Sequence, residues 1–252
     1  MPESVTTLER DLTLAPPPAL DAARTALFLD LDGTLAPIKP RPRDVGPAPE
    51  RTELLKTATR RLGGRLAVIS GRALPDIDHI LQGSVTAAAA VHGLVRRNAA
   101  GAVLSRPPHP ALNTARVALD WLEDQPGVLI EDKRLSLAVH YRRAPDRADE
   151  VLAACREVAA GTGLVLQLGS MVVELRSPGA DKGDSVRAFM AEAPFAGASP
   201  VFVGDDVTDE DGFAAATELG GYGVLVGEPR ETAARYRLSD VDAVLAWLAG
   251  AP

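Results

Sequence analysis

The chain has 252 residues, enough for one large domain or two small ones with a buried core. Hydrophobic residues make up 46% of it and charged residues 24%, a balance typical of globular proteins, which excludes a disordered chain, collagen and a coiled coil. The formal net charge is −7, and this acidic balance argues against general nucleic-acid binding, which needs basic surfaces.

The sequence also narrows the setting in which the protein works. Cys155 is the single cysteine, so no disulfide can form within the chain. No apolar run reaches the roughly 18 residues that span a membrane, and the N-terminus lacks the basic and apolar regions of a secretory signal. We therefore expect a cytoplasmic protein, monomeric, with neither a membrane nor a nucleic acid as partner.

The first third of the chain predicts alternating strands and helices. Residues 1–24 are polar and proline-containing, so we expect a leader segment there. A continuous apolar run over 25–31 predicts a buried parallel strand, and five prolines over 37–49 predict a loop. The alternation that follows favours a doubly wound, Rossmann-like parallel sheet. The expected elements are helix 50–62, strand 65–69, helix 74–81, strand 86–91 and a hairpin over 94–105.

The pattern changes after Pro107, Pro108 and Pro110. Strands now come in close pairs, each pair after a helix, which predicts antiparallel hairpins in a small α+β unit. After Pro178 the alternation of helix and strand returns. We therefore predict a discontinuous α/β core over 25–105 and 178–252, with a cap domain of residues 106–177 inserted in it. The later elements expected are strands 127–132, 135–141, 163–168 and 171–176, helix 182–192, strand 200–204, helix 209–217, strand 222–226 and helix 240–249.

The strongest chemical signal is Asp30-Leu31-Asp32-Gly33-Thr34, at the carboxyl end of the first predicted strand. At strand spacing, residues two apart point to the same side, and open α/β sheets bind ligands at this edge. Two carboxylates held there repel each other unless a cation lies between them, and oxygen ligands suit Mg²⁺. A solvated Asp-Gly turn is an equal alternative for this motif alone.

Three further polar motifs follow predicted strands or begin predicted helices. Ser70-Gly71-Arg72 forms a strand-to-helix turn suited to an anion, although Ser70 could simply cap the helix. Lys182 is one of only four lysines and begins a helix, where a cation is unfavourable without an anionic partner; a solvated lysine is the alternative. The acidic run 205–211 follows the strand at 200–204, and an acidic first helical turn explains Asp209 better than Asp205.

These four motifs, in this order, resemble those of the haloacid dehalogenase superfamily, whose members are mostly Mg²⁺-dependent phosphatases. The resemblance implies that Asp30 is a nucleophile that forms an aspartyl-phosphate, and that Asp32 acts as acid and then as base. It implies Mg²⁺ ligands from Asp30, the Asp32 carbonyl and Asp205, and phosphoryl contacts from Ser70, Gly71 and Lys182. Supporting residues behind these ligands would be Thr34, Asp206 and Asp209.

Four other stretches resemble the trehalose-6-phosphate phosphatase family within that superfamily. They are Ala90–Leu94, Glu131–Lys133, Leu137–Arg142 and Gly169–Arg176, and the resemblance extends over about 25–248. It implies a small-molecule sugar phosphate as substrate, trehalose 6-phosphate, hydrolysed to trehalose and phosphate. The implied sugar contacts are Glu131, Lys133 and Glu174 from the cap, and Arg72, His92 and Gly93 from the core.

Alternatives remain at this stage. Glu131 and Lys133 could form an exposed pair of little energetic weight, and Glu174 could be an ordinary solvent-facing strand residue. We expect His140 to be structural rather than catalytic. Ser170 stands where the family pattern predicts a lysine. Other functions open to the chain are hydrolysis of another sugar phosphate or non-catalytic binding of one, and a functional pairing with a trehalose-6-phosphate synthase also stays open.

Overall fold

The computed structural model describes residues 14–250, so residues 1–13 of the expected leader lie outside the described residues. The larger of two sheets has eight strands in the order β12-β11-β10-β1-β2-β3-β4-β5. Its strands pair in parallel except that β4 is antiparallel to both β3 and β5. Its strands are β1 (Thr25–Leu29), β2 (Leu66–Ile69), β3 (Ala87–Ala90), β4 (Val95–Arg97), β5 (Val103–Ser105), β10 (Ser199–Gly204), β11 (Tyr222–Val226) and β12 (Tyr236–Leu238).

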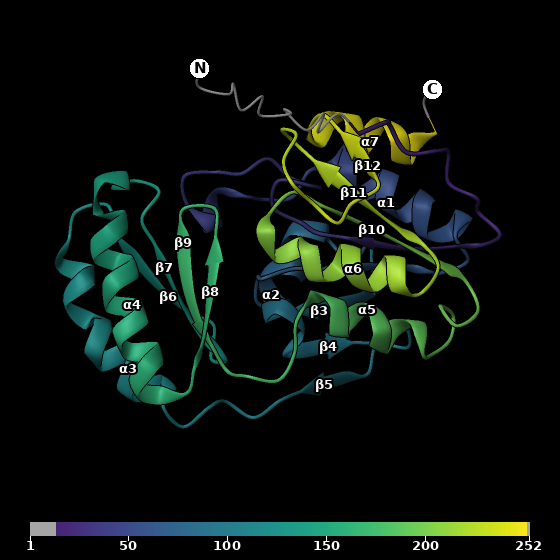
Figure 1. Ribbon diagram of the computed structural model, residues 1–252. Helices are drawn as coiled ribbons and strands as arrows, with labels where there is room; N and C mark the ends of the chain where they lie inside the picture. The colour runs from purple at the N-terminus through teal and green to yellow at the C-terminus, as the bar shows by residue number, and fades with distance from the viewer. Residues whose placement is uncertain (1–13, 251–252) are drawn as a thin grey trace, which may run out of the picture.

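Helices cover both faces of this sheet (Figure 1). One face packs against α1 (Pro49–Arg61), α2 (Leu74–Leu81) and α7 (Val241–Ala249), and the other against α5 (Lys182–Met190) and α6 (Glu210–Glu218). Strand β1 is buried throughout because Leu27 and Leu29 point to the first face and Phe28 to the second. The predicted doubly wound, Rossmann-like core is therefore confirmed.

The smaller sheet is fully antiparallel, in the order β6-β7-β9-β8. Helices α3 (Leu112–Leu119) and α4 (Ala148–Thr162) pack on its outer face, where Val151 and Cys155 meet Val139 and Val173 (Figure 1). Its other face looks toward the larger sheet. We call residues 112–176 the cap and the remaining described residues the core. The cap strands are β6 (Leu129–Asp132), β7 (Ser136–His140), β8 (Val165–Gly169) and β9 (Val172–Arg176).

Two features of the core were not expected from the sequence. Strand β12 extends the sheet by one strand beyond β11. The segment before β1 then packs over this end of the core, since the Arg237 amide donates to the Ala15 carbonyl (3.0 Å) and the Trp247 indole to the Pro18 carbonyl (2.9 Å). None of the described helices combines the length and apolar character needed to cross a membrane.

Candidate active site

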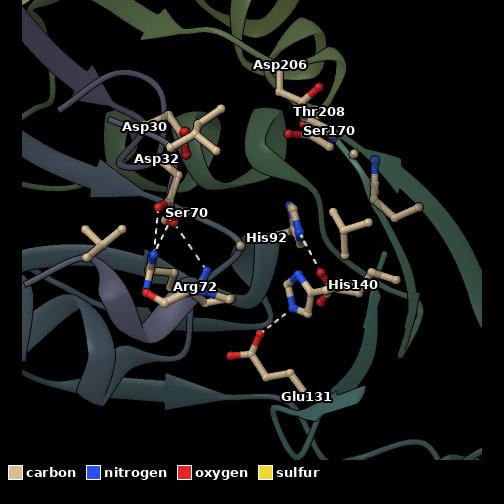
Figure 2. A pocket seen from close by; sticks show the side chains of 18 of the residues that line it. Asp30, Asp32, Ser70, Arg72, His92, Glu131, His140, Ser170, Asp206 and Thr208 are labelled. Atoms are coloured by element: carbon tan, nitrogen blue, oxygen red, sulfur yellow. Dashed lines mark hydrogen bonds and ion pairs between the residues drawn. The ribbon is translucent and has the colours of Figure 1, made fainter. Parts of the chain in front are cut away.

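The carboxyl ends of β1, β2 and β10 and the start of α5 meet at one edge of the larger sheet, facing the cap. A cavity of about 160 Å³ lies between them (Figure 2). The motif residues from both sides line this cavity: Asp30, Asp32, Ser70, Gly71, Arg72, His92, Lys182, Asp205 and Asp206 from the core, and Glu131, Lys133 and Glu174 from the cap.

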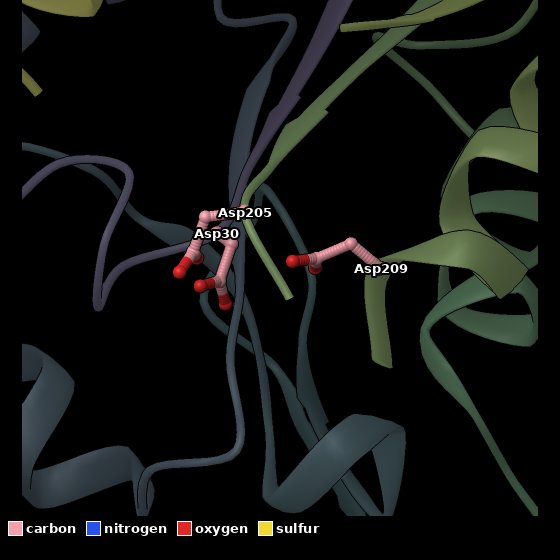
Figure 3. Close-up of side chains that lie close together, drawn as sticks. All are labelled: Asp30, Asp205 and Asp209. Carbon is pink, nitrogen blue, oxygen red and sulfur yellow. The ribbon is translucent and has the colours of Figure 1, made fainter. Parts of the chain in front are cut away.

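Three carboxylates gather at this edge, those of Asp30, Asp205 and Asp209, with oxygens within 4.8 Å of one another (Figure 3). Asp30 and Asp205 come together because β1 and β10 are parallel neighbours, with Leu29 opposite Val203. Lys182 places its Nζ 2.9 Å from Asp30 Oδ1 and 2.6 Å from Asp209 Oδ1. When all three carboxylates are ionised, the one ammonium leaves two negative charges without compensation.

The electrostatics of this cluster fit a divalent cation. Burial raises the pKa of Asp30 to about 8 and that of Asp205 to about 9, with further upward shifts from neighbouring carboxylates. Burial alone would lower the pKa of Lys182, but Asp209 and Asp30 outweigh it and raise that pKa, so the lysine stays charged. A cation of charge +2 would balance the cluster, and its oxygen-only donors suit a hard ion such as Mg²⁺.

Gly33 makes room for the carboxylate of Asp205. Its φ of +81° lies in the left-handed region, and a Cβ built on it would lie 2.1 Å from Asp205 Oδ2. The hydroxyl of the next residue, Thr34, is 3.5 Å from Asp205 Oδ1. The Asp-Gly-Thr turn is thus shaped around an acid that lies 172 positions further along the chain than Gly33.

Asp209 is fully buried and held by its own turn. Its Oδ2 accepts from the Asp206 amide at 2.9 Å, in a capping box at the start of the short helix Val207–Asp209. A Cβ on Gly204 would lie 2.2 Å from Asp209 Cγ, so only glycine fits there. The acidic run therefore does begin a helix, and it also brings Asp209 to Lys182.

Two guanidinium nitrogens of Arg72 bind the two carboxylate oxygens of Asp32. Its Nε donates to Asp32 Oδ2 at 2.6 Å and its Nη2 to Oδ1 at 2.7 Å (Figure 2). Its Nη1 donates to the Pro42 carbonyl at 2.9 Å. The Asp32 carboxylate thus has one fixed orientation, because a bidentate arginine pair sets both angle and distance. All three donor atoms of Arg72 are engaged within the core.

A strained turn carries His92 to the same cavity. Val91, His92 and Gly93 all have positive φ, of 48°, 55° and 101°, and such values are unfavourable for a β-branched residue like Val91. A Cβ on Gly71 would lie 2.6 Å from His92 Nε2, so the glycine leaves space for the ring. Ser70, also buried, accepts the Arg72 amide on its hydroxyl at 3.2 Å.

The cap contributes a buried ion pair that also contacts the core. Lys133 Nζ lies 3.1 Å from Glu174 Oε2 and 2.9 Å from the Gly71 carbonyl, and His92 Nε2 lies 3.3 Å from the same carboxylate oxygen. Burial alone would raise the pKa of Glu174, yet Lys133 and His92 hold it well below its ordinary value. Burial lowers the pKa of His92, which favours its neutral form. Lys133 is therefore not an exposed lysine, and Glu174 does not face solvent.

Two more contacts complete the rim of the cavity. Glu131 Oε2 lies 2.8 Å from His140 Nε2 (Figure 2). The Ser170 amide donates to Asp206 Oδ2 at 3.1 Å, and this contact joins the cap to the core. Glu131 thus pairs with a histidine of the neighbouring strand rather than with Lys133.

Comparison with known proteins decides the family. A family model described as Trehalose-phosphatase matches residues 28–242. The chain belongs to the trehalose-phosphatase family. It is 37% identical to the trehalose-6-phosphate phosphatase of Escherichia coli K12 over 230 residues, covering 90% of this chain and 86% of that one. It is 39% identical over 221 residues to a probable trehalose-phosphate phosphatase of Sinorhizobium fredii, covering 83% and 80%.

Solved structures agree on the fold. The C-terminal domain of the Candida albicans trehalose-6-phosphate phosphatase superposes with a TM-score of 0.80 at 22% identity, covering 92% of this chain and 96% of that one. A trehalose-6-phosphate phosphatase related protein superposes with a TM-score of 0.74 at 26% identity, covering 89% and 95%. Membership in the trehalose-phosphatase family confirms the predicted superfamily and the enzyme class, a phosphoric monoester hydrolase.

Sequence reasoning missed several parts of this trehalose-phosphatase cavity. It did not predict that Arg72 binds Asp32, that Lys133 reaches the core, or that Ile38 and Lys39 line the cavity from the proline-rich loop. Lys39 carried a usable signal, because it is one of only four lysines. The contact of Lys133 depends on how the cap docks against the core, and that of Arg72 with Asp32 depends on the pairing of β1 with β2. No short motif records either arrangement.

Proposed function

We propose that this member of the trehalose-phosphatase family hydrolyses trehalose 6-phosphate to trehalose and phosphate with Mg²⁺ as cofactor. One observation carries the proposal: a single cavity joins the Asp30–Asp205–Lys182 cluster of the core to the Lys133–Glu174 pair of the cap. The first group suits a phosphate, and the second suits the hydroxyls of a sugar.

The residues for a divalent cation are the carboxylates of Asp30 and Asp205 and the main-chain carbonyl of Asp32. Their fit rests on the excess negative charge of the cluster and on the raised pKa of both carboxyls. Mg²⁺ bound there would neutralise this charge and lower the repulsion between Asp30 and a phosphate dianion. Lys182, already at Asp30, would share the phosphoryl oxygens with Ser70 and the Gly71 amide.

The proposed reaction has two steps. In the first, an Asp30 oxygen attacks phosphorus, the bond from phosphorus to the sugar oxygen breaks, and Asp32 gives its proton to that oxygen. In the second, Asp32 takes a proton from water, the water oxygen attacks phosphorus, and phosphate leaves while the Asp30 carboxylate is regenerated. Arg72 holds the Asp32 carboxylate in one orientation, and we propose that this orientation serves both proton transfers.

The cap would recognise the sugar. Glu174 uses its Oε2 for Lys133 and His92, and the Ser136 hydroxyl also helps to hold the pKa of its carboxyl low. A sugar hydroxyl would give this carboxylate a further donor, because its buried Oε1 makes no hydrogen bond of good geometry with the described residues. Lys133 and Glu131 lie on the same wall of the cavity, and charged groups form strong, directional bonds to hydroxyls.

Phosphate release with Mg²⁺ tests the proposal, with trehalose 6-phosphate compared with glucose 6-phosphate and other hexose phosphates. We expect the highest kcat/KM for trehalose 6-phosphate, and we expect Asp30→Asn to lose more than about 10³-fold in kcat while keeping its circular dichroism spectrum. Equal rates on glucose 6-phosphate would favour another sugar phosphate as substrate. No turnover of any sugar phosphate would favour a binding role.

A further inference from the structure

A second groove lies beside the active-site cavity and shares Glu131, His140 and Arg142 with it, but its other arginines have no role in the proposed reaction. Its volume is about 420 Å³, against about 160 Å³ for the active-site cavity. The core loop 40–43 forms one wall, and the cap segments 127–131 and 140–143 form the other. The groove therefore spans the boundary between core and cap.

The groove is strongly basic although the chain as a whole carries −7. Arg41 and Arg43 line it from the core, and Arg142 and Arg143 from the cap. Its one carboxylate, Glu131, is already paired with His140 at 2.8 Å. This local excess of positive charge contrasts with the negative net charge of the chain, and it favours an anionic partner.

Most of these guanidinium groups have no partner in the part of the chain that the structure describes. Within residues 14–250, the side chains of Arg41, Arg43 and Arg143 make no hydrogen bond or ion pair, and Arg142 donates to the Ser170 carbonyl at 2.5 Å. Elsewhere in the chain, arginines are paired with carboxylates; Arg97, for example, donates two hydrogen bonds to the carboxylate of Asp78. The groove thus concentrates unpaired positive charge from two separate parts of the fold.

Both walls have fixed backbones. Gly127, with a φ of +90°, packs so closely that a Cβ on it would lie 2.7 Å from the Arg143 carbonyl. On the core side, two prolines flank Arg41, and the Pro42 carbonyl accepts from Arg72 at 2.9 Å. The arginines are therefore presented from rigid positions, which lowers the entropic cost of binding a ligand.

We propose that this groove binds a polyvalent oxyanion of the phosphate type, held between the core arginines and the cap arginines. Like charges across a boundary repel, so an anion between them would remove a cost of bringing cap and core together. The guanidinium fork matches two phosphate oxygens at once, which makes arginine a suitable residue for such a ligand. This site is separate from Ser70 and Lys182; only the choice of orthophosphate as a probe and the phosphate site at Lys182 rest on the proposed function.

The shared chemistry of the ligand admits two sources. Orthophosphate is one, since it would be released next to the groove. A larger phosphorylated metabolite with two anionic groups is the other, and the volume of the groove leaves room for it. Orthophosphate and diphosphate are therefore the two probes, and the one with the lower Kd at the groove identifies the source.

Equilibrium dialysis against each probe tests the proposal without measuring turnover. We expect two phosphate sites per chain in the unaltered protein, and a rise of at least about tenfold in the Kd of one site in the double variant Arg41→Gln/Arg43→Gln. Arg143→Gln should weaken the same site from the cap side. The matched control is Arg24→Gln/Arg156→Gln, two exposed arginines without side-chain partners among the described residues, and it should retain both sites.

Four results would overturn the proposal. One is a single phosphate site in the unaltered protein whose Kd stays the same in Arg41→Gln/Arg43→Gln, since that site would then be the one at Lys182. Another is an unchanged second site in Arg41→Gln/Arg43→Gln. The third is equal weakening in the control pair, because binding would then report net charge alone. The fourth is an unchanged Kd of this site in Arg143→Gln, because the ligand would then not contact the cap.

Discussion

Arg72 holds Asp32 in a bidentate pair, with Nε 2.6 Å from Oδ2 and Nη2 2.7 Å from Oδ1. Asp32 lies two residues after Asp30, at the end of β1, and Arg72 follows β2, the neighbouring strand. The pair therefore joins two adjacent strand ends across the cavity. It gives the proposed acid and base of the reaction a fixed direction, although Arg72 was expected from the sequence to contact the sugar.

Replacing Arg72 by lysine distinguishes a role in orienting Asp32 from a role in binding the sugar. Arg72→Lys keeps the charge but loses the second hydrogen bond, so Asp32 can turn away; we expect kcat to fall about 10- to 100-fold with little change in KM. Arg97→Lys, which breaks a remote bidentate pair with Asp78, is the matched control and should leave kcat unchanged. A raised KM with a normal kcat in Arg72→Lys would instead assign Arg72 to the sugar.

The stability of the metal-free protein should fall as pH rises. The pKa values of Asp30 and Asp205 are raised from 3.8 to about 8 and about 9, so the folded protein keeps protons that the unfolded chain has lost. The stabilisation is complete below about pH 4 and is lost as the pH rises toward these raised values.

Thermal unfolding in EDTA and in Mg²⁺, at about pH 5, 7 and 9, measures this effect. Mg²⁺ takes the place of the protons, so the rise in Tm that Mg²⁺ causes should be larger at higher pH. Each kcal/mol of added unfolding free energy corresponds to a rise of about 2–4 °C. Asp205→Asn should show a smaller dependence of Tm on pH in EDTA. An increase in Tm from Mg²⁺ that is the same at all three pH values, in both proteins, would contradict the charge argument.

The pair Lys133–Glu174 should show strong coupling. Each single change, Lys133→Met or Glu174→Gln, leaves a buried partner without its counterpart, and we expect each to cost about 3–5 kcal/mol in unfolding free energy. The double variant should cost clearly less than the sum of the two. Urea unfolding measures this cycle, and the exposed pair Arg147–Glu150 is the control, with an expected coupling of about 0.5 kcal/mol or less. Additive losses at Lys133 and Glu174 would argue against a functional ion pair there.

Gly33→Ala tests whether the turn after β1 is shaped around Asp205. The new Cβ would lie 2.1 Å from Asp205 Oδ2, so we expect lost Mg²⁺ binding and lost phosphate release. Gly220→Ala is a matched control, because its φ of +83° is nearly the same as the +81° of Gly33 and its surroundings are open. Both should lose about 1 kcal/mol of stability from backbone strain, but only Gly33→Ala should lose the metal. Equal Mg²⁺ affinity in the two variants would count against this account.

The sequence predicted the fold well because its signals were local. The apolar run 25–31 indicated a strand buried on both faces, and the paired strands of 127–141 and 163–176 indicated a separate antiparallel sheet. Strand β12 was missed because Tyr236–Leu238 has only three residues, all half-buried, and depends on pairing with β11.

The candidate site was predictable only in part. Residues of the motifs after β1, β2 and β10 could be grouped, because parallel strands end at a common edge. Partners could not be assigned, because the contact of Lys133 with the Gly71 carbonyl joins residues 62 positions apart and depends on how cap and core dock. The role of Gly33 was likewise seen only as a tight turn, since the nearby Asp205 carboxylate is brought there by the sheet.

The central claim is that Asp30 and Asp205 share one divalent cation, and calorimetric titration with Mg²⁺ tests it most directly. The claim predicts one site per chain in the unaltered protein and its loss in Asp205→Asn, with Asp206→Asn, a neighbour outside the carboxylate cluster, retaining it. An unchanged Mg²⁺ Kd in Asp205→Asn would contradict the claim.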